Sequence, residues 1–215
     1  MKRALILGCS HAAGSELFKD PSVFVRPENI CAFELNNSYA TRIAQKLGYN
    51  PDQQAEPGTS NDRMFRIWES QSRILDAQDL VIACWTGYNR SETYDEINRT
   101  WIPLGKEFGL LTEYQRQWIV NNSADAVGRL NKIKNILALN SMAQHMGIPV
   151  ININSFWPVP YQSWPDYCRW PVPVDFLTWG NQNGYDKTEG YHFLLDAHEN
   201  FAQYVVDAMQ LTSVL

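Results

Sequence analysis

A serine near one end of the chain and a histidine near the other have surroundings that suit nucleophilic catalysis. Ser10 follows a short apolar run, in Gly8-Cys9-Ser10-His11. A serine at the turn between a strand and a helix is exposed, and the backbone N–H groups that follow it point at anything bound there. The same residue also suits the N-terminal cap of a helix, so the local sequence leaves both interpretations open.

His192 opens the last predicted helix, in Glu189-Gly190-Tyr191-His192. A lone histidine at a helix start is more often structural. Glu189, three residues earlier, can hold the imidazole and select its tautomer, as the acid of a catalytic triad does. Asp186 lies further upstream and is the alternative partner. His11 is not expected to act as the base, because side chains at adjacent positions of a turn usually diverge.

Two further residues could stabilise negative charge on a substrate oxygen. Asn89 follows a second apolar run, in Gly87-Tyr88-Asn89, and its amide could donate to an oxyanion. Gly58, in the segment 57–62, could supply a backbone N–H. Both have a structural alternative, Asn89 as a helix cap and Gly58 as an ordinary turn. Asn61 and Tyr88 are candidate substrate contacts, although the segment 60–62 is interpreted first as a helix start.

Alternating strand and helix patterns predict the frame that positions these residues. Unbroken apolar runs predict buried parallel strands at 4–7, 79–85 and 148–153. Helical spacing of apolar residues predicts helices at 37–47, after Ser60, at 125–146 and at about 193–209. Gly48 and Gly147 close two of these helices. Residues 90–122 are expected to be helical in pieces.

This order predicts one α/β domain over residues 1–215, a three-layer α/β/α sandwich with a parallel sheet. Ligands of such sheets bind beyond the carboxyl ends of the strands. The turns at Gly8–Ser10 and Trp85–Asn89 should therefore face one common crevice.

Composition excludes several classes of function. The 215 residues carry 18 Lys and Arg against 23 Asp and Glu, a net charge of −5 without a basic run, so we expect no nucleic-acid partner. The early apolar run is too short for a signal peptide or a membrane span, so we expect a cytoplasmic protein without a membrane partner. The four cysteines match no zinc spacing, so we expect free thiols and no metal.

A segment rich in proline and aromatic residues, 155–180, precedes the histidine block. Its prolines argue against a regular helix or a central strand. One interpretation is an ordered loop that walls the substrate pocket, with Trp157 and Trp164 stacking on sugar or acyl groups. The alternatives are that the rings cover the end of the sheet or are buried in a homo-oligomer interface.

Taken in order, these blocks resemble the SGNH hydrolases, also called GDSL esterases or lipases. The serine, glycine, asparagine and Asp-x-x-His blocks of that family correspond to Gly8-Cys9-Ser10, Gly58, Gly87-Tyr88-Asn89 and Glu189-Gly190-Tyr191-His192. Two positions depart from the family pattern, because Cys9 and Glu189 each stand where the family has aspartate.

The resemblance implies a flavodoxin-like fold and a serine esterase that needs no cofactor. It implies that Ser10 attacks an ester, such as an O-acyl sugar or another small metabolite, while His192 and Glu189 act as base and acid. It assigns the oxyanion hole to Ser10, Gly58 and Asn89. A non-catalytic binding protein on the same fold and an acyltransferase with the same triad are the alternatives.

Overall fold

Four parallel strands form the central sheet of the protein. The computed structural model describes residues 2–17, 32–88, 90–95, 100–104, 125–158, 164–188 and 191–211. The strands are β1 (Arg3–Gly8), β2 (Asn50–Gln53), β3 (Leu80–Trp85) and β6 (Val150–Asn154), in the order β2-β1-β3-β6. Ala4 lies opposite Leu80, and Val81 opposite Val150. The three strands predicted from apolar runs are confirmed.

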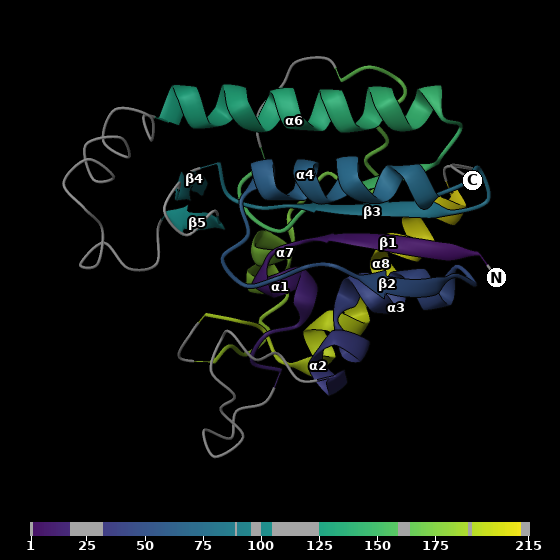
Figure 1. Ribbon diagram of the computed structural model, residues 1–215. Helices are drawn as coiled ribbons and strands as arrows, with labels where there is room; N and C mark the ends of the chain where they lie inside the picture. The colour runs from purple at the N-terminus through teal and green to yellow at the C-terminus, as the bar shows by residue number, and fades with distance from the viewer. Residues whose placement is uncertain are drawn as a thin grey trace.

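Helices cover both faces of this sheet (Figure 1). On one face lie α4 (Asn61–Gln71), followed by a short 3-10 turn (Ser72–Ile74), and α6 (Asp125–His145). The other face carries α1 (Ser10–Ala13), α3 (Tyr39–Lys46), α7 (Phe176–Gln182) and α8 (Leu195–Leu211), with α2 (Ala32–Asn37) beside them. The three-layer α/β/α sandwich is therefore confirmed.

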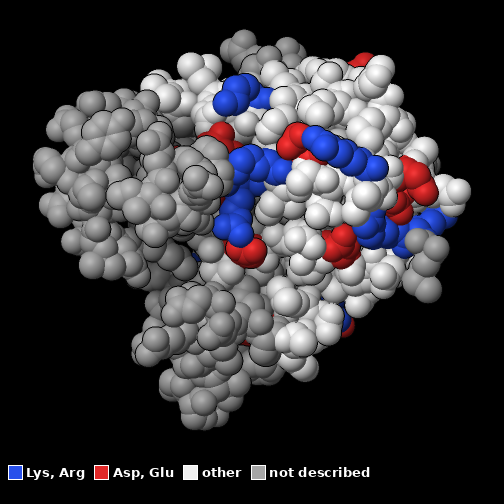
Figure 2. All heavy atoms as spheres, in the orientation of Figure 1, with Lys and Arg blue, Asp and Glu red and all other residues white. Residues whose placement is uncertain are grey.

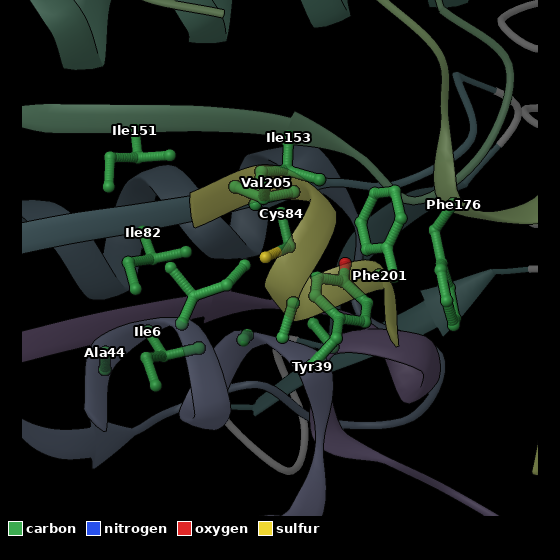
Figure 3. Packing of buried hydrophobic residues seen from close by; sticks show 14 of the residues in the cluster. Ile6, Tyr39, Ala44, Ile82, Cys84, Ile151, Ile153, Phe176, Phe201 and Val205 are labelled. Carbon is green, nitrogen blue, oxygen red and sulfur yellow. The ribbon is translucent and has the colours of Figure 1, made fainter. Parts of the chain in front are cut away.

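The two faces of the sheet pack into separate cores, because successive side chains of a strand point to opposite faces. Ile6, Ile82 and Ile153 pack with Tyr39 of α3 and Phe201 of α8 (Figure 3). Leu5, Leu7, Val81 and Trp85 pack on the opposite side with residues of α4 and α6. Strands buried on both faces must be apolar throughout, which is why the sequence shows unbroken apolar runs instead of alternation.

Local end signals define several of the helices. The Ser60 hydroxyl accepts from the Arg63 N–H at 3.1 Å and caps α4 as the sequence predicts. Gly48 and Gly147 have φ values of 80° and 70°, and both follow helix ends as predicted. The predicted helix 37–47 is divided at Ser38, whose hydroxyl caps α3 by accepting from the Thr41 N–H.

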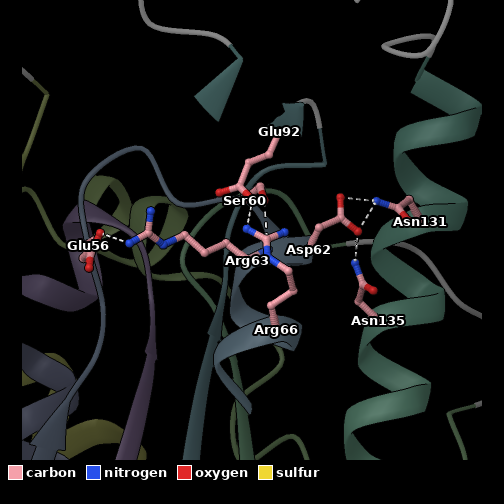
Figure 4. Close-up of polar contacts among 8 residues, drawn as sticks. All are labelled: Glu56, Ser60, Asp62, Arg63, Arg66, Glu92, Asn131 and Asn135. Atoms are coloured by element: carbon pink, nitrogen blue, oxygen red, sulfur yellow. Dashed lines mark hydrogen bonds and ion pairs between the residues drawn. The ribbon is translucent and has the colours of Figure 1, made fainter. Parts of the chain in front are cut away.

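Polar side chains join α4 to its neighbours (Figure 4). The Asp62 carboxylate accepts hydrogen bonds from the side-chain amides of Asn131 and Asn135 on α6. Arg66 pairs with the buried Glu92 carboxylate, on the strand β4 (Ser91–Asp95). Asp62 is thereby committed to the packing of α4 against α6.

Two segments differ from the sequence-based expectation. β4 pairs with β5 (Thr100–Leu104) in an antiparallel hairpin, so the expectation of helix is wrong for this part of 90–122. The hairpin is rich in Thr, Tyr, Trp and Ile, which favour strands. Residues 105–122 lie outside the described part of the chain. The predicted loop 155–180 ends in a helix, α7, because the Asp175 carboxylate caps it by accepting from the Thr178 N–H at 2.9 Å.

Charged residues of both signs share the face of the molecule that is drawn in Figure 2. On the face drawn in Figure 2, Lys and Arg side chains are interleaved with Asp and Glu. Within the described residues, no helix combines the length and apolarity that crossing a bilayer requires.

Cys9, Cys84 and Cys168 are buried free thiols.

Candidate active site

Ser10 lies immediately beyond the carboxyl end of β1 and begins the single turn of α1. Cys9 is extended, and its carbonyl accepts from the Ala13 N–H at 2.9 Å. Gly8 allows this close turn, since a Cβ there would lie 2.5 Å from the Ala12 Cβ. The Ser10 residue is only 4% exposed, so the expectation of an exposed serine is wrong, because the turn is packed against neighbouring segments. The turn predicted from Gly8-Cys9-Ser10 therefore exists, with Cys9 and not Ser10 at the N-cap.

The Gly58 turn lies beside the Ser10 turn. The Gln54 N–H donates to the Ile6 carbonyl at 2.9 Å, and the Glu56 N–H donates to the Gly8 carbonyl at 3.1 Å. These bonds continue the pairing of β2 with β1 as far as the end of β1. Gly58 follows with a φ of 78°, a left-handed conformation that favours glycine.

Asn61 holds the loop that follows β3. Its Oδ1 atom accepts from the Thr86 N–H at 3.1 Å, and its Nδ2 atom donates to the carbonyls of Thr86 and Gly87, each at 3.4 Å. The Asn61 side-chain amide, a candidate substrate contact, is therefore engaged with the backbone. Its effect is to position the chain that leads to Tyr88. Asn89 lies outside the described residues.

His192 reaches this edge of the molecule from the far end of the chain. Its ring lies against the His11 ring, with centroids 4.7 Å apart, and His11 is the residue next to Ser10. The fold thus brings the serine and histidine blocks together at the carboxyl edge of the sheet. Glu189, the predicted acid, lies outside the described residues.

A carboxylate that sequence reasoning missed lies beside His192. The Oε2 atom of Glu16 is 3.1 Å from the Nδ1 atom of His192. The Thr188 hydroxyl donates to the same Oε2 atom and accepts from the His192 N–H at 3.2 Å. The local signal that could have found Glu16 is its place just after the serine turn, in Ser10-His11-Ala12-Ala13-Gly14-Ser15-Glu16.

Two buried histidines adjoin His192. His11 packs edge-on against Phe156 and Phe176, with centroids 4.5 and 5.7 Å away, and burial lowers its pKa well below the ordinary value, with a further contribution from His192. Burial also lowers the pKa of His198 to about 3, and its Nδ1 atom accepts from the Tyr39 N–H. Both rings are therefore neutral at pH 7, and neither suits the role of base.

A buried lysine supports the loop after β6. Lys132 of α6 donates from Nζ to the carbonyls of Phe156 and Trp157, at 3.4 and 3.2 Å. Burial lowers its pKa to about 7, against the opposing attraction of the Asp175 carboxylate. Because Phe156 contacts His11, this lysine helps to place the wall of the candidate site.

The two tryptophans predicted to contact substrate have different surroundings. Trp157 is 48% exposed, and its ring centroid lies 5.9 Å from that of the half-buried Tyr88. Trp164 instead packs against Trp170 and the core on the α4 and α6 side. Its segment runs back along β6, where the Arg169 carbonyl accepts from the Asn152 N–H, and the predicted substrate contact of Trp164 stays a prediction.

The described side chains at the site do not form a metal-binding cluster. Within those residues, no three His, Cys, Asp or Glu side chains are grouped so that they could bind one.

Solved structures with the same fold span nearly the whole chain. A lipolytic protein of the G-D-S-L family from Desulfitobacterium hafniense DCB-2 superposes with a TM-score of 0.51 at 11% identity, covering 97% of this chain and 99% of its own. TesA gives a TM-score of 0.51 at 12% identity, covering 97% of this chain and 98% of its own.

An acetyl xylan esterase, Est2A, from the rumen bacterium Butyrivibrio proteoclasticus gives a TM-score of 0.50 at 13% identity, covering 98% of this chain and 64% of its own. No family model matches the sequence, and its comparison with curated proteins finds no match. The likeness is therefore one of fold: the chain has the α/β/α fold of the SGNH/GDSL hydrolases.

Proposed function

We propose that the protein is a serine ester hydrolase in which Ser10 is the nucleophile and His192 the general base. One observation carries the proposal. The fold packs His192 against His11, the residue next to Ser10, with ring centroids 4.7 Å apart, although the two blocks come from opposite ends of the chain. A nucleophile and a base must come within hydrogen-bond reach for this chemistry.

In the proposed reaction, Ser10 Oγ attacks the ester carbonyl while His192 Nε2 accepts its proton. The tetrahedral oxyanion is held by the N–H groups of Ser10 and Gly58 and by the Asn89 amide, and a donor of this kind contributes about 3–4 kcal/mol. His192 then protonates the leaving alcohol. Water, activated by the same ring, hydrolyses the acyl-enzyme. General acid–base assistance contributes about 10²–10⁴ in rate.

The neutral state of His11 suits this role for His192. A charged neighbour would repel the imidazolium that forms when His192 takes the serine proton. Because burial lowers the pKa of His11 well below the ordinary value, that ring carries no charge at pH 7 and opposes the imidazolium little.

The exposed ring of Trp157 supports one class of substrate. Trp157 is 48% exposed beside Tyr88, and an exposed aromatic face can stack on flat or ring-shaped groups at low entropic cost. We infer an acyl ester of a small alcohol, such as an O-acyl sugar, as the substrate.

Labelling with a fluorophosphonate tests the nucleophile directly. We expect the wild-type protein to be labelled on Ser10, located by mass spectrometry of the labelled peptide, and to hydrolyse short-chain acyl esters. Ser10→Ala should abolish both. Ser15→Ala, at a buried serine of the same segment, is the matched control and should keep both. Absence of labelling in the folded wild type would favour a non-catalytic binding protein.

A further inference from the structure

The carboxylate beside His192 comes from an unexpected part of the chain. We propose that Glu16, on the segment directly after the serine turn, is the positioning residue that orients His192, in place of Glu189. The inference deepens the proposed function and rests on it for its catalytic meaning. The carboxylate and the nucleophile would then belong to one short stretch, residues 10–16.

The backbone around Glu16 is built to direct its side chain. Gly14 ends α1 in a left-handed conformation, with a φ of 77°, and a Cβ there would lie 2.6 Å from the Glu34 carbonyl oxygen. Glu16 itself has a φ of 61°, which is unfavourable for a residue with a Cβ. The Glu34 carboxylate holds it there by accepting from the Glu16 N–H at 2.9 Å.

Strained backbone gathers at this site. Among the described residues, three that are not glycine have positive φ: Glu16, Trp157 and Tyr191. Glu16 contacts His192, Tyr191 precedes it, and Trp157 follows the phenylalanine that packs on His11. Conformations of this kind persist where surrounding contacts enforce them, and they concentrate at functional sites.

The contacts of Glu16 match the requirements of an orienting acid. Its Oε2 atom lies at an ion-pair distance of 3.1 Å from His192 Nδ1, although the two groups are not aligned as a hydrogen bond. The two side chains are only 14% and 16% exposed, so solvent screens their attraction weakly. Thr188 joins the same oxygen to the His192 backbone. A carboxylate on the Nδ1 side keeps the proton there, leaves Nε2 free to accept the serine proton and stabilises the imidazolium.

The other titratable groups near His192 do not supply this charge. His11 and His198 face it, and burial lowers the pKa of each. Arg90 and Lys187 lie close enough to influence His11 and are positive. The Glu16 carboxylate, in contrast, is negative and makes an ion-pair contact with the His192 ring.

Four substitutions separate Glu16 from its competitor. Glu16→Gln should lower the rate of Ser10 labelling and kcat by about 10²–10⁴-fold, as loss of the triad carboxylate does elsewhere. The apparent pKa of the labelling rate should fall by about one unit or more, because the imidazolium loses its partner. Glu16→Asp should recover part of the rate, and Glu189→Gln should have a small effect. Glu34→Gln, which removes a nearby charge but keeps an acceptor for the Glu16 N–H, should leave the pH profile nearly unchanged.

Titration of the His192 ring by NMR reports the pairing without requiring activity. A lower His192 pKa in folded Glu16→Gln, with no such change in Glu189→Gln, supports the inference. This holds even if Ser10 proves unreactive, because an unreactive Ser10 refutes only the proposed function. An unchanged His192 pKa in Glu16→Gln overturns the inference. A large loss of rate confined to Glu189→Gln also overturns the inference. That result would leave the proposed serine hydrolase function standing.

Discussion

Replacing Lys132 with methionine should change how the stability of the protein depends on pH. The lysine is fully buried, and burial lowers its pKa from 10.5 to about 7. The unfolded chain binds this proton more tightly than the folded chain, so between these two values the stability of the wild type rises with pH. Each pH unit above the folded pKa contributes about 1.4 kcal/mol, so from about pH 6 to about pH 9 the expected gain is about 2–3 kcal/mol.

Urea unfolding at a series of pH values measures this gain. Lys132→Met lacks the titrating group. The difference in free energy of unfolding, wild type minus variant, should therefore rise by about 2–3 kcal/mol from about pH 6 to about pH 9. Lys134→Met, at an exposed lysine of the same helix, is the matched control and should follow the wild type. Parallel curves for the wild type and Lys132→Met would refute the reasoning, since they would mean that Lys132 keeps an ordinary pKa.

Three further predictions follow from the described contacts. A Cβ at Gly128 would lie 2.3 Å from the Tyr88 carbonyl oxygen, so Gly128→Ala should lower the free energy of unfolding in urea by about 1–3 kcal/mol and slow ester hydrolysis. Wild-type stability and a wild-type rate in this variant would contradict the close approach. Burial lowers the pKa of His198 from 6.5 to about 3, so the unfolded chain binds this proton more tightly than the folded chain. The protein should therefore be about 2 kcal/mol less stable at pH 5 than at pH 7, and His198→Asn should lose most of that acid sensitivity in the same assay. Trp157→Ala should raise KM while Ser10 labelling continues, whereas Trp164→Ala should lower the free energy of unfolding by about 2–3 kcal/mol with KM unchanged. A raised KM in Trp164→Ala together with a loss of stability in Trp157→Ala would mean that the two residues have the opposite roles.

Features encoded in a few neighbouring residues were predictable from the sequence. Unbroken apolar runs predicted β1, β3 and β6, since a strand covered on both faces must be apolar throughout. Ser60, Gly48 and Gly147 predicted helix ends, because a side-chain cap or a positive φ is a property of one residue and its neighbours. The turn carrying Ser10 was predictable for the same reason.

Segments whose conformation depends on distant partners were not predictable. β2 reads Asn-Pro-Asp-Gln and has no apolar pattern, yet it forms an edge strand because the backbone of β1 offers it hydrogen bonds. Trp157 and Trp164 look alike in the sequence, but Trp157 is exposed beside Tyr88 and Trp164 packs against Trp170 beside β6. Only the path of the chain around the sheet separates them.

The candidate site divides in the same way. Sequence order was enough to nominate Ser10 and His192, because each stands in a recognisable block next to a predicted element. The same reasoning chose Glu189 as the acid, since a spacing of three residues is a local signal. The contact between Glu16 and His192 joins residues from opposite ends of the chain, and no local pattern encodes it. The tertiary structure decides it, because the left-handed turn after α1 and the docking of the segment before α8 bring the two side chains together.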